Sequence, residues 1–239
     1  MGYGFLIIII FPLLIQTQTA ADDSNPRYNC SSTSEKYAKN STYENNLKNL
    51  LSDLNNKSLD HVFYNTSYGR NPNRVYGLAL CHGNNTSSSN CHSCVKFATQ
   101  YITGSCPNNK AIIYWLDFCY VKYSNVDFFG HIDTDNKLTL VMNPHKVTYS
   151  LTAITLGLLS NLSKKATADN HMFARGKAFE PRSGFDIFGL VQCSGDLSKY
   201  NCIKCLDYAM KQLPINSTNL GVKVVTGSCV VRYDSYEFR

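Results

Sequence analysis

Apolar residues recur at helical spacing in two separate places along the chain. In each place, residues three or four positions apart would form one apolar stripe on a helix. The stripes consist of Leu47, Leu50, Leu51 and Leu54 in the first half and Leu151, Ile154, Leu158 and Leu162 in the second half. The pattern predicts one long amphipathic helix in each half.

A second helix is predicted in each half, starting at a C-x-x-C sequence. The apolar positions that follow again share one helical face. They are Cys94, Val95, Ala98 and Ile102 in the first half and Cys205, Leu206, Ala209 and Leu213 in the second. Each half is therefore expected to contain two helices.

The remaining apolar runs are rich in β-branched and aromatic residues, which favour strands. These runs span residues 111–116, 118–123, 221–225 and 229–233, and residues 138–142 alternate Leu138, Leu140 and Met142 on a face expected to be buried. Helices and strands together predict an α+β fold, with two helices packed on an antiparallel sheet in each half.

The cysteines show that the two halves are copies. Four cysteines of the first half, Cys81, Cys91, Cys94 and Cys119, recur as Cys193, Cys202, Cys205 and Cys229. Neighbouring residues repeat too, since Tyr-Gly-Leu-Ala-Leu precedes Cys81 and Phe-Gly-Leu-Val-Gln precedes Cys193. We expect tandem disulfide-stapled domains at residues 22–130 and 131–239, packed together because residues 124–137 contain no proline or low-complexity run.

The first residues resemble a signal peptide. An apolar run at residues 5–15 is too short to span a bilayer, and small residues before Asp22 suit cleavage after residue 21. No second long apolar stretch or lipid-anchor tail follows. The sequence thus predicts a secreted protein without a transmembrane segment, whose ten cysteines form five disulfides in an oxidising compartment.

Asparagine-linked glycosylation is expected for a secreted chain with N-x-[ST] sequons. The chain has eight of them, at Asn29, Asn40, Asn56, Asn65, Asn84, Asn85, Asn161 and Asn216. Any residue that carries a glycan must lie at the surface. We expect about half of the sequons at most to be occupied.

Charge and motifs give little support to catalysis or to nucleic-acid binding. The net charge of +6 is a modest excess without a dense basic tract, and it favours a solvated basic surface over a specific anionic partner. The chain has no G-x-S-x-G, H-E-x-x-H or P-loop, and His61, His131, His145 and His171 are scattered without spaced acidic partners. We expect a non-enzymatic protein without a cofactor.

The C-x-x-C sequences allow two chemical alternatives. A cysteine at a helix amino terminus could exchange disulfides, and His82 and His92 stand close enough to Cys81, Cys91 and Cys94 to suggest zinc. The second copy has no histidine there, and no βαβ pattern surrounds either motif. Both redox activity and metal binding are therefore disfavoured.

The cysteine spacing resembles that of a plant family, the cysteine-rich repeat secretory proteins, built from two ginkbilobin-homologous (salt-stress response/antifungal) domains. The family signature C-x8-C-x2-C is present at Cys193, Cys202 and Cys205, and the first copy departs from it by one residue between Cys81 and Cys91. The spacing to Cys106 and Cys119 is also similar to the family. The resemblance covers nearly all of the mature chain.

The resemblance implies a pairing of the cysteines. The implied disulfides are Cys30–Cys106, Cys81–Cys91, Cys94–Cys119, Cys193–Cys202 and Cys205–Cys229. The second copy lacks the first and fifth cysteines together, and a sequon at Asn216 stands near the missing fifth position. The second domain is predicted to be the less stable one because it has one cross-link fewer.

The resemblance also implies a candidate sugar site. Mannose-binding antifungal members of the family hold the sugar with an Asn, an Arg and a Glu; the first copy has Ser31, Ile113 and Ser124 at those places, which implies a lost site. The second copy has Lys223 and Asp234, with Asn143 as a replacement for the missing Asn. The competing interpretation is that Lys223 and Asp234 form a cross-strand ion pair on an exposed sheet face.

Taken together, these patterns predict a secreted extracellular (apoplastic) binding module that acts in plant defence or stress response. Its expected partner is an extracellular protein or a cell-wall or fungal glycan, because aromatic residues such as the sixteen tyrosines suit both. A mannose-type lectin that uses the second domain is the alternative, and a disulfide-exchange protein is a weaker one.

Overall fold

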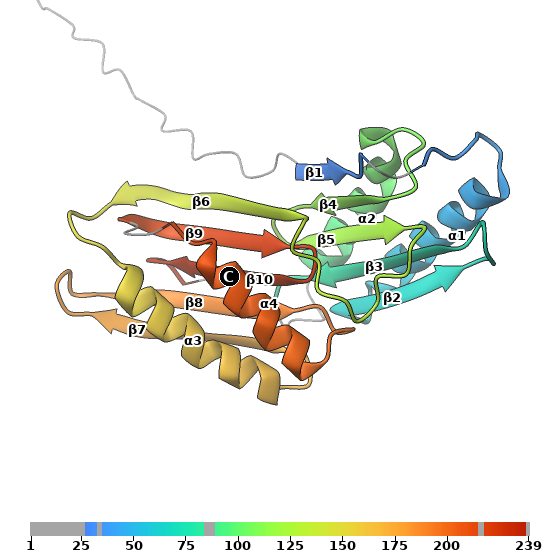
Figure 1. The fold of residues 1–239 in the computed structure, drawn as a ribbon. Helices are drawn as coiled ribbons and strands as arrows, with labels where there is room; N and C mark the ends of the chain where they lie inside the picture. The colour runs from blue at the N-terminus through green and yellow to red at the C-terminus, as the bar shows by residue number, and fades with distance from the viewer. Residues whose placement is uncertain (1–26, 33–34, 84–88, 215–217, 238–239) are drawn as a thin grey trace, which may run out of the picture.

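The chain forms two five-stranded antiparallel sheets, each with two helices on one face (Figure 1). The computed structural model describes residues 27–32, 35–83, 89–214 and 218–237. The first domain contains β1 (Arg27–Cys30), α1 (Thr42–Lys57), β2 (Phe63–Tyr68), β3 (Val75–Cys81), α2 (Ser89–Ser105), β4 (Ile112–Trp115) and β5 (Cys119–Ser124). The second contains β6 (Lys137–Lys146), α3 (Thr152–Ala168), β7 (Phe173–Glu180), β8 (Phe185–Cys193), α4 (Lys199–Lys211), β9 (Asn219–Thr226) and β10 (Cys229–Asp234).

The two sheets have the same topology. Their strand orders are β1-β4-β5-β3-β2 and β6-β9-β10-β8-β7, so each strand of the first sheet has a counterpart in the second. The predicted α+β class and the tandem arrangement are confirmed. The predicted strand at 138–142 extends over β6, where Leu138, Leu140 and Met142 are half-buried instead of buried.

The long helix of the first domain is specified by its cap and its apolar stripe. Ser41 caps α1 by accepting a hydrogen bond from the Glu44 backbone N–H at 3.3 Å, and the Glu44 carboxylate accepts one from the Asn40 N–H at 2.5 Å. The predicted leucine stripe is buried against the sheet. In the second domain Leu158 and Leu162 of the predicted stripe are buried in α3, Leu151 is buried just before the helix, and Ile154 is only half-buried.

A glycine in the repeated motif explains how closely each long helix approaches its sheet. A Cβ on Gly77 would lie 2.4 Å from a methyl of Leu50, and a Cβ on Gly189 would lie 2.8 Å from a methyl of Leu158. Leu50 and Leu158 are equivalent residues of the two stripes. The glycines thus allow a helix leucine to contact the strand backbone, and any side chain there would push the helix away.

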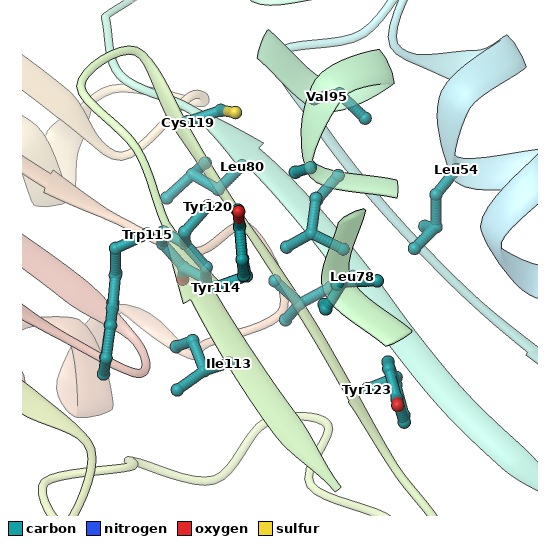
Figure 2. Close-up of a cluster of buried hydrophobic side chains, with 14 of the residues drawn as sticks. Leu54, Leu78, Leu80, Val95, Ile113, Tyr114, Trp115, Cys119, Tyr120 and Tyr123 are labelled. Carbon is teal, nitrogen blue, oxygen red and sulfur yellow. The ribbon is translucent and has the colours of Figure 1, made fainter. Parts of the chain in front are cut away.

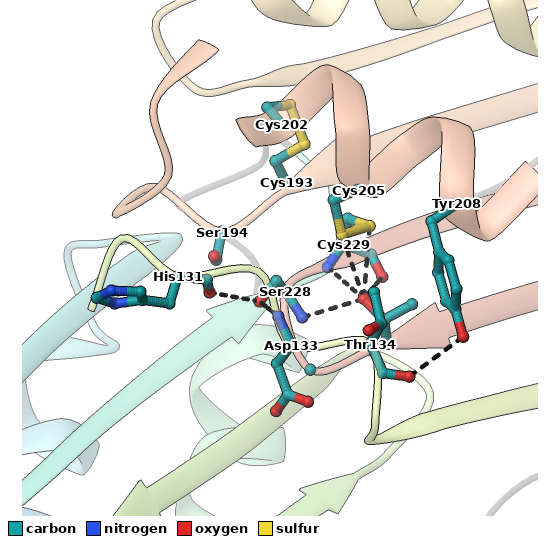
Figure 3. Close-up of a disulfide and its surroundings, with 12 residues drawn as sticks. His131, Asp133, Thr134, Cys193, Ser194, Cys202, Cys205, Tyr208, Ser228 and Cys229 are labelled. Atoms are coloured by element: carbon teal, nitrogen blue, oxygen red, sulfur yellow. Dashed lines mark hydrogen bonds between the residues drawn. A yellow bond between two sulfur atoms is a disulfide. The ribbon is translucent and has the colours of Figure 1, made fainter. Parts of the chain in front are cut away.

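The ten cysteines form five disulfides, in the pairs that the family resemblance implies: Cys30–Cys106, Cys81–Cys91, Cys94–Cys119, Cys193–Cys202 and Cys205–Cys229. Figure 3 shows the two disulfides of the second domain. The Cα–Cα distances of all five disulfides, 5.5 to 6.1 Å, lie in the ordinary range. Since both cysteines of each C-x-x-C bind distant partners, neither motif has a free thiol pair for disulfide exchange or thiolates for zinc.

The domains pack through the helix-free face of the second sheet. Val225 and Val230 on this face belong to the same buried cluster as the core of the first domain. Figure 2 shows side chains of that core, including Trp115 and Tyr120. The indole N–H of Trp115 donates to the Thr226 carbonyl at 3.5 Å. Gln192, which has no exposed surface, accepts from the Gly83 N–H at 2.9 Å and donates to the carbonyls of Cys81 and Gly83 at 3.0 and 3.2 Å.

The connection between the sheets is fixed to both domains. From the first domain, the Lys122 ammonium forms an ion pair with Asp133. From the second domain, the Ser228 hydroxyl accepts a hydrogen bond from the Asp133 N–H at 3.0 Å and donates one to the His131 carbonyl at 3.3 Å (Figure 3). The domain boundary predicted near residue 130 falls in this segment. The expectation that the domains are packed together agrees with these contacts.

Candidate ligand-binding sites

Two of the three predicted sugar ligands of the second domain lie next to each other. Asn143 in β6 pairs with Gly221 in β9, and a Cβ on Gly221 would lie 2.9 Å from the Asn143 Cβ and 2.8 Å from the Asp234 carboxyl carbon. Lys223 is two residues further along β9, on the same face of the sheet. The structure therefore brings the predicted set to one face, around a glycine that leaves room for it.

All three residues are buried. Asn143, Lys223 and Asp234 each expose only 4 % of their surface. The Asn143 amide donates to Ser235 Oγ at 3.1 Å, and Asp234 forms an ion pair with Arg232 at 3.2 Å. The second Asp234 oxygen, Oδ1, has no hydrogen-bond partner among the described residues.

The alternative interpretation of Lys223 and Asp234 as an exposed cross-strand ion pair is wrong. The first domain covers this face, and the Lys223 ammonium donates to the Asp117 carbonyl at 3.2 Å. The same carbonyl lies 2.8 Å from His82 Nδ1, which is itself 3.2 Å from Lys223 Nζ. Because a carbonyl only accepts, His82 carries its proton on Nδ1 and donates it to Asp117.

His82 is uncharged in this environment. Burial, followed by the nearby charge of Lys223, lowers the pKa of its imidazole well below the ordinary value, against the opposing effect of the hydrogen bond to Asp117. Sequence reasoning placed His82 near the cysteines and considered zinc. The structure instead makes it a buried link between the domains, which depends on contacts between residues far apart in the chain.

In the first domain, the three positions that correspond to the family sugar ligands line a cavity. Ser31, Ile113 and Ser124 all face this space of about 310 Å³. The ion pair of Lys122 and Asp133 forms part of its wall. Burial alone would raise the pKa of the Asp133 carboxyl, but the charge and hydrogen bond of Lys122, together with the hydrogen bonds from Asn136, outweigh burial and lower it.

An aromatic patch on the first domain was not predicted. Phe97, Tyr101 and Phe118, which we name the α2 patch, are 41 %, 53 % and 49 % exposed. The ring centroids of Phe97 and Tyr101 are 4.5 Å apart. Phe97, Leu116 and Phe118 line a hollow of about 350 Å³. The helical spacing of Phe97 and Tyr101 could have indicated a shared face, but their exposure depends on the tertiary structure.

The sequons differ in accessibility. Asn29, Asn40, Asn56 and Asn161 are exposed, and Asn65 is half-buried. Asn84, Asn85 and Asn216 lie outside the described residues, as does the predicted leader at 1–21. His61, His131, His145 and His171 are exposed.

Two further observations concern metals and membranes. In residues 27–32, 35–83, 89–214 and 218–237, no group of three or more His, Cys, Asp or Glu residues is arranged to hold a metal ion. Across the same residues, no helix has both the length and the apolar character required to span a bilayer.

The fold and cysteine framework define a tandem, disulfide-stapled α+β repeat protein. The model of the salt stress response/antifungal family matches residues 29–126 and 143–236. The chain belongs to this family.

Relatives and solved structures agree with this assignment. The chain is 39 % identical to an antimicrobial ginkbilobin-2-like protein of Castanea crenata, over 97 % of this chain and 96 % of that protein. It is 40 % identical to cysteine-rich repeat secretory protein 38 of Arabidopsis thaliana, over 99 % and 95 %. The tandem DUF26 ectodomain of the Arabidopsis cysteine-rich receptor-like protein PDLP8 has the same fold, with a TM-score of 0.68 and 23 % identity over 87 % of this chain and 96 % of that one.

Proposed function

We propose that this protein is a secreted, non-enzymatic binding module of the plant extracellular space that acts in defence or stress response. It is released by cleavage after residue 21, carries glycans on exposed sequons and binds an extracellular protein or a cell-wall polymer. The names of its relatives support this proposal, since one is called antimicrobial and another secretory.

The α2 patch is the observation that carries the proposal. Exposed aromatic rings grouped around a hollow are typical of interaction surfaces, because they bury much area at low entropic cost and also stack on sugar rings. Phe97 and Tyr101 stand on a helix that the Cys94–Cys119 disulfide ties to β5. A rigid aromatic surface loses little freedom on binding.

The second domain supports the patch from behind. Phe118 belongs to the turn between β4 and β5, where its carbonyl accepts from the His82 N–H at 2.8 Å. The neighbouring Asp117 carbonyl accepts from Lys223 and from His82. Under this proposal, Lys223 is a positioning residue that fixes the Phe118 turn, and it has no direct contact with the ligand.

Binding to isolated cell walls tests the proposal. The full secreted chain is mixed with plant or fungal cell-wall material, and the bound fraction is measured by sedimentation. We expect Phe97→Ala with Phe118→Ala to weaken binding by about tenfold or more. The matched control is Tyr200→Ala with Tyr236→Ala, since these two rings are also exposed but lie elsewhere. Equal binding by both double variants would refute the role of the α2 patch.

A mannose-type site in the second domain is the second candidate. It is favoured by the proximity of Asn143 to Asp234 and by the unpartnered Asp234 Oδ1, since sugar hydroxyls would donate to such an oxygen. A glycan array tests it. If mannose glycans are bound and Asp234→Asn abolishes this binding while Phe97→Ala does not, the sugar site is in the second domain. Absence of mannose binding by the wild type would exclude this candidate.

A further inference from the structure

The two helices of the second domain enclose an apolar groove, which we name the α3–α4 groove. It has a volume of about 240 Å³. Its walls include Leu156 of α3 and Met210 of α4, together with Leu213 and Tyr233. A water molecule takes up about 30 Å³ of the liquid, so the groove has room for about eight groups of that size.

The first domain has a groove at the equivalent place, but its chemistry is different. This groove, of about 320 Å³, is lined by Glu44 and Lys48, which form an ion pair at 3.0 Å across one helical turn. The positions that correspond to them in the second domain are Thr152 and Leu156, so the charged pair is replaced by a small residue and a leucine. Leu156 is 37 % exposed.

The same change occurs on the opposite wall. Thr99 in α2 corresponds to Met210 in α4, counted from the equivalent cysteines Cys94 and Cys205. Helix α4 ends at Lys211, whereas α2 continues to Ser105. Both walls of the groove have therefore become more apolar in the second domain, while the fold around them is unchanged.

A buried hydroxyl lies in this apolar setting. Thr155 replaces the leucine found at the equivalent position of the first domain, Leu47, and it lines the groove. Thr155 is 2 % exposed, and its Oγ1 has no hydrogen-bond partner among the described residues. A threonine in a helix can bond the carbonyl four residues earlier, but this one does not. A hydroxyl buried without a partner destabilises the fold, so a ligand oxygen that bonds it would remove this cost.

A cation stands at the rim of the groove. Lys211 lines it, is exposed, and forms no ion pair with any carboxylate of the described residues. The first domain has the neutral Gln100 at this position. The groove thus combines apolar walls, one unpartnered hydroxyl and one available positive charge.

We propose that the α3–α4 groove binds a small amphipathic carboxylic acid. The apolar body of the acid packs against Leu156 and Met210, its carboxylate pairs with Lys211, and the Thr155 hydroxyl bonds one of its oxygens. The groove volume suits an acid with a chain of about eight carbons. This site is separate from the α2 patch and does not depend on the function proposed for it.

Octanoate and octan-1-ol are the probes, titrated into the full secreted chain by calorimetry. We expect octanoate to bind saturably with a dissociation constant below about 1 mM and to shift the methyl signal of Met210 in NMR spectra. Leu156→Lys, which restores the residue type of the first domain, should weaken binding about tenfold or more, because a charged group enters the apolar wall. Leu156→Met is the control and should bind within about threefold of the wild type.

Two further variants separate the contributions of charge and hydroxyl. Lys211→Gln should weaken octanoate binding about two- to fivefold and leave octan-1-ol binding unchanged. Thr155→Val keeps the shape of the side chain and should weaken octanoate binding about threefold or more. Lys48→Ala in the groove of the first domain should change nothing.

The proposal is overturned if octanoate does not bind saturably, or if Leu156→Lys and Lys211→Gln bind it as the wild type does. It is also overturned if the groove is an interface between two copies of the chain. In that case the wild type would be a dimer, Leu156→Lys would be a monomer, and octanoate would not bind to either.

Discussion

Gln192 links the two domains, and its replacement by leucine should uncouple them. Leucine is the residue at the equivalent position of the first domain, Leu80, so it suits a β-strand core. In Gln192→Leu, the Gly83 N–H and the Cys81 carbonyl lose a partner in a buried interface. The substitution preserves side-chain volume closely while removing all three hydrogen bonds.

The expected loss of stability follows from those three bonds. A typical hydrogen bond contributes a net of about 0.5–1.5 kcal/mol, and a buried group left without a partner costs about 1–3 kcal/mol. The half-buried Gly83 can recover water, and the buried leucine offsets part of the loss. We expect Gln192→Leu to reduce the free energy of unfolding by about 2–4 kcal/mol and the melting temperature by about 5–15 °C.

The only tryptophan of the chain is a direct probe of this interface. Trp115 is buried and donates to Thr226 of the second domain. In guanidinium titrations of Gln192→Leu, tryptophan fluorescence should therefore change at a lower denaturant concentration than circular dichroism, because the domains separate before they unfold. The wild type should show coincident transitions.

Gln100→Leu is the matched control, because Gln100 is an exposed glutamine away from the interface. It should unfold within about 0.5 kcal/mol of the wild type. If Gln192→Leu unfolds like this control, with coincident fluorescence and dichroism transitions, the hydrogen bonds of Gln192 do not hold the domains together and the reasoning is wrong.

Three other predictions concern single elements of the fold. Replacing Cys30 and Cys106 by serine should cost more stability than replacing Cys81 and Cys91, because the sequence separations of the two disulfides are 76 and 10. The loop-closure approximation gives losses of about 4.5 and about 2.8 kcal/mol. Equal losses in denaturant titrations would contradict this prediction. The pKa of His82 is lower in the folded protein than in the unfolded chain, so on acidification the unfolded chain binds a proton that the folded protein does not bind. The stability of the wild type should therefore fall as pH drops below about 6.5, by up to about 1.4 kcal/mol per pH unit. His82→Gln should flatten this dependence between pH 7 and 5, and an unchanged slope would assign the effect to another group. Gly189→Ala should destabilise by about 1–3 kcal/mol through the clash with Leu158, whereas Gly157→Ala, at an open position of α3, should stabilise by about 0.5–1 kcal/mol; thermal melts that rank them the other way would refute the close-approach argument.

The helices could be predicted from the sequence more fully than the strands. The stripe of Leu47, Leu50 and Leu54 has a clear helical period, and it is buried as expected. Strand β3 (Val75–Cys81) is buried along its whole length, so its sequence has no alternation to identify it. The edge strand β7 (Phe173–Glu180) was also missed, because it has no β-branched residue and depends on β8 for its hydrogen bonds.

The candidate site could be predicted only in part. Residue types and cysteine spacing led to Asn143, Lys223 and Asp234, and the fold does bring them to one face of the second sheet. Their burial could not be predicted, because it depends on how distant parts of the chain pack together. The contact of Lys223 with Asp117 joins residues 106 positions apart, and no local pattern reports such a contact.

By itself, the sequence determined the family, the tandem repeat and the α+β class, because periodic apolar positions and cysteine spacing act locally or through covalent links. Only the tertiary structure decided which surfaces remain available for binding. Packing of the two domains buries Lys223 against Asp117 and leaves Phe97 and Phe118 exposed. Exposure is a property of the whole packed molecule, since the surface of each residue depends on neighbours that are distant in the chain.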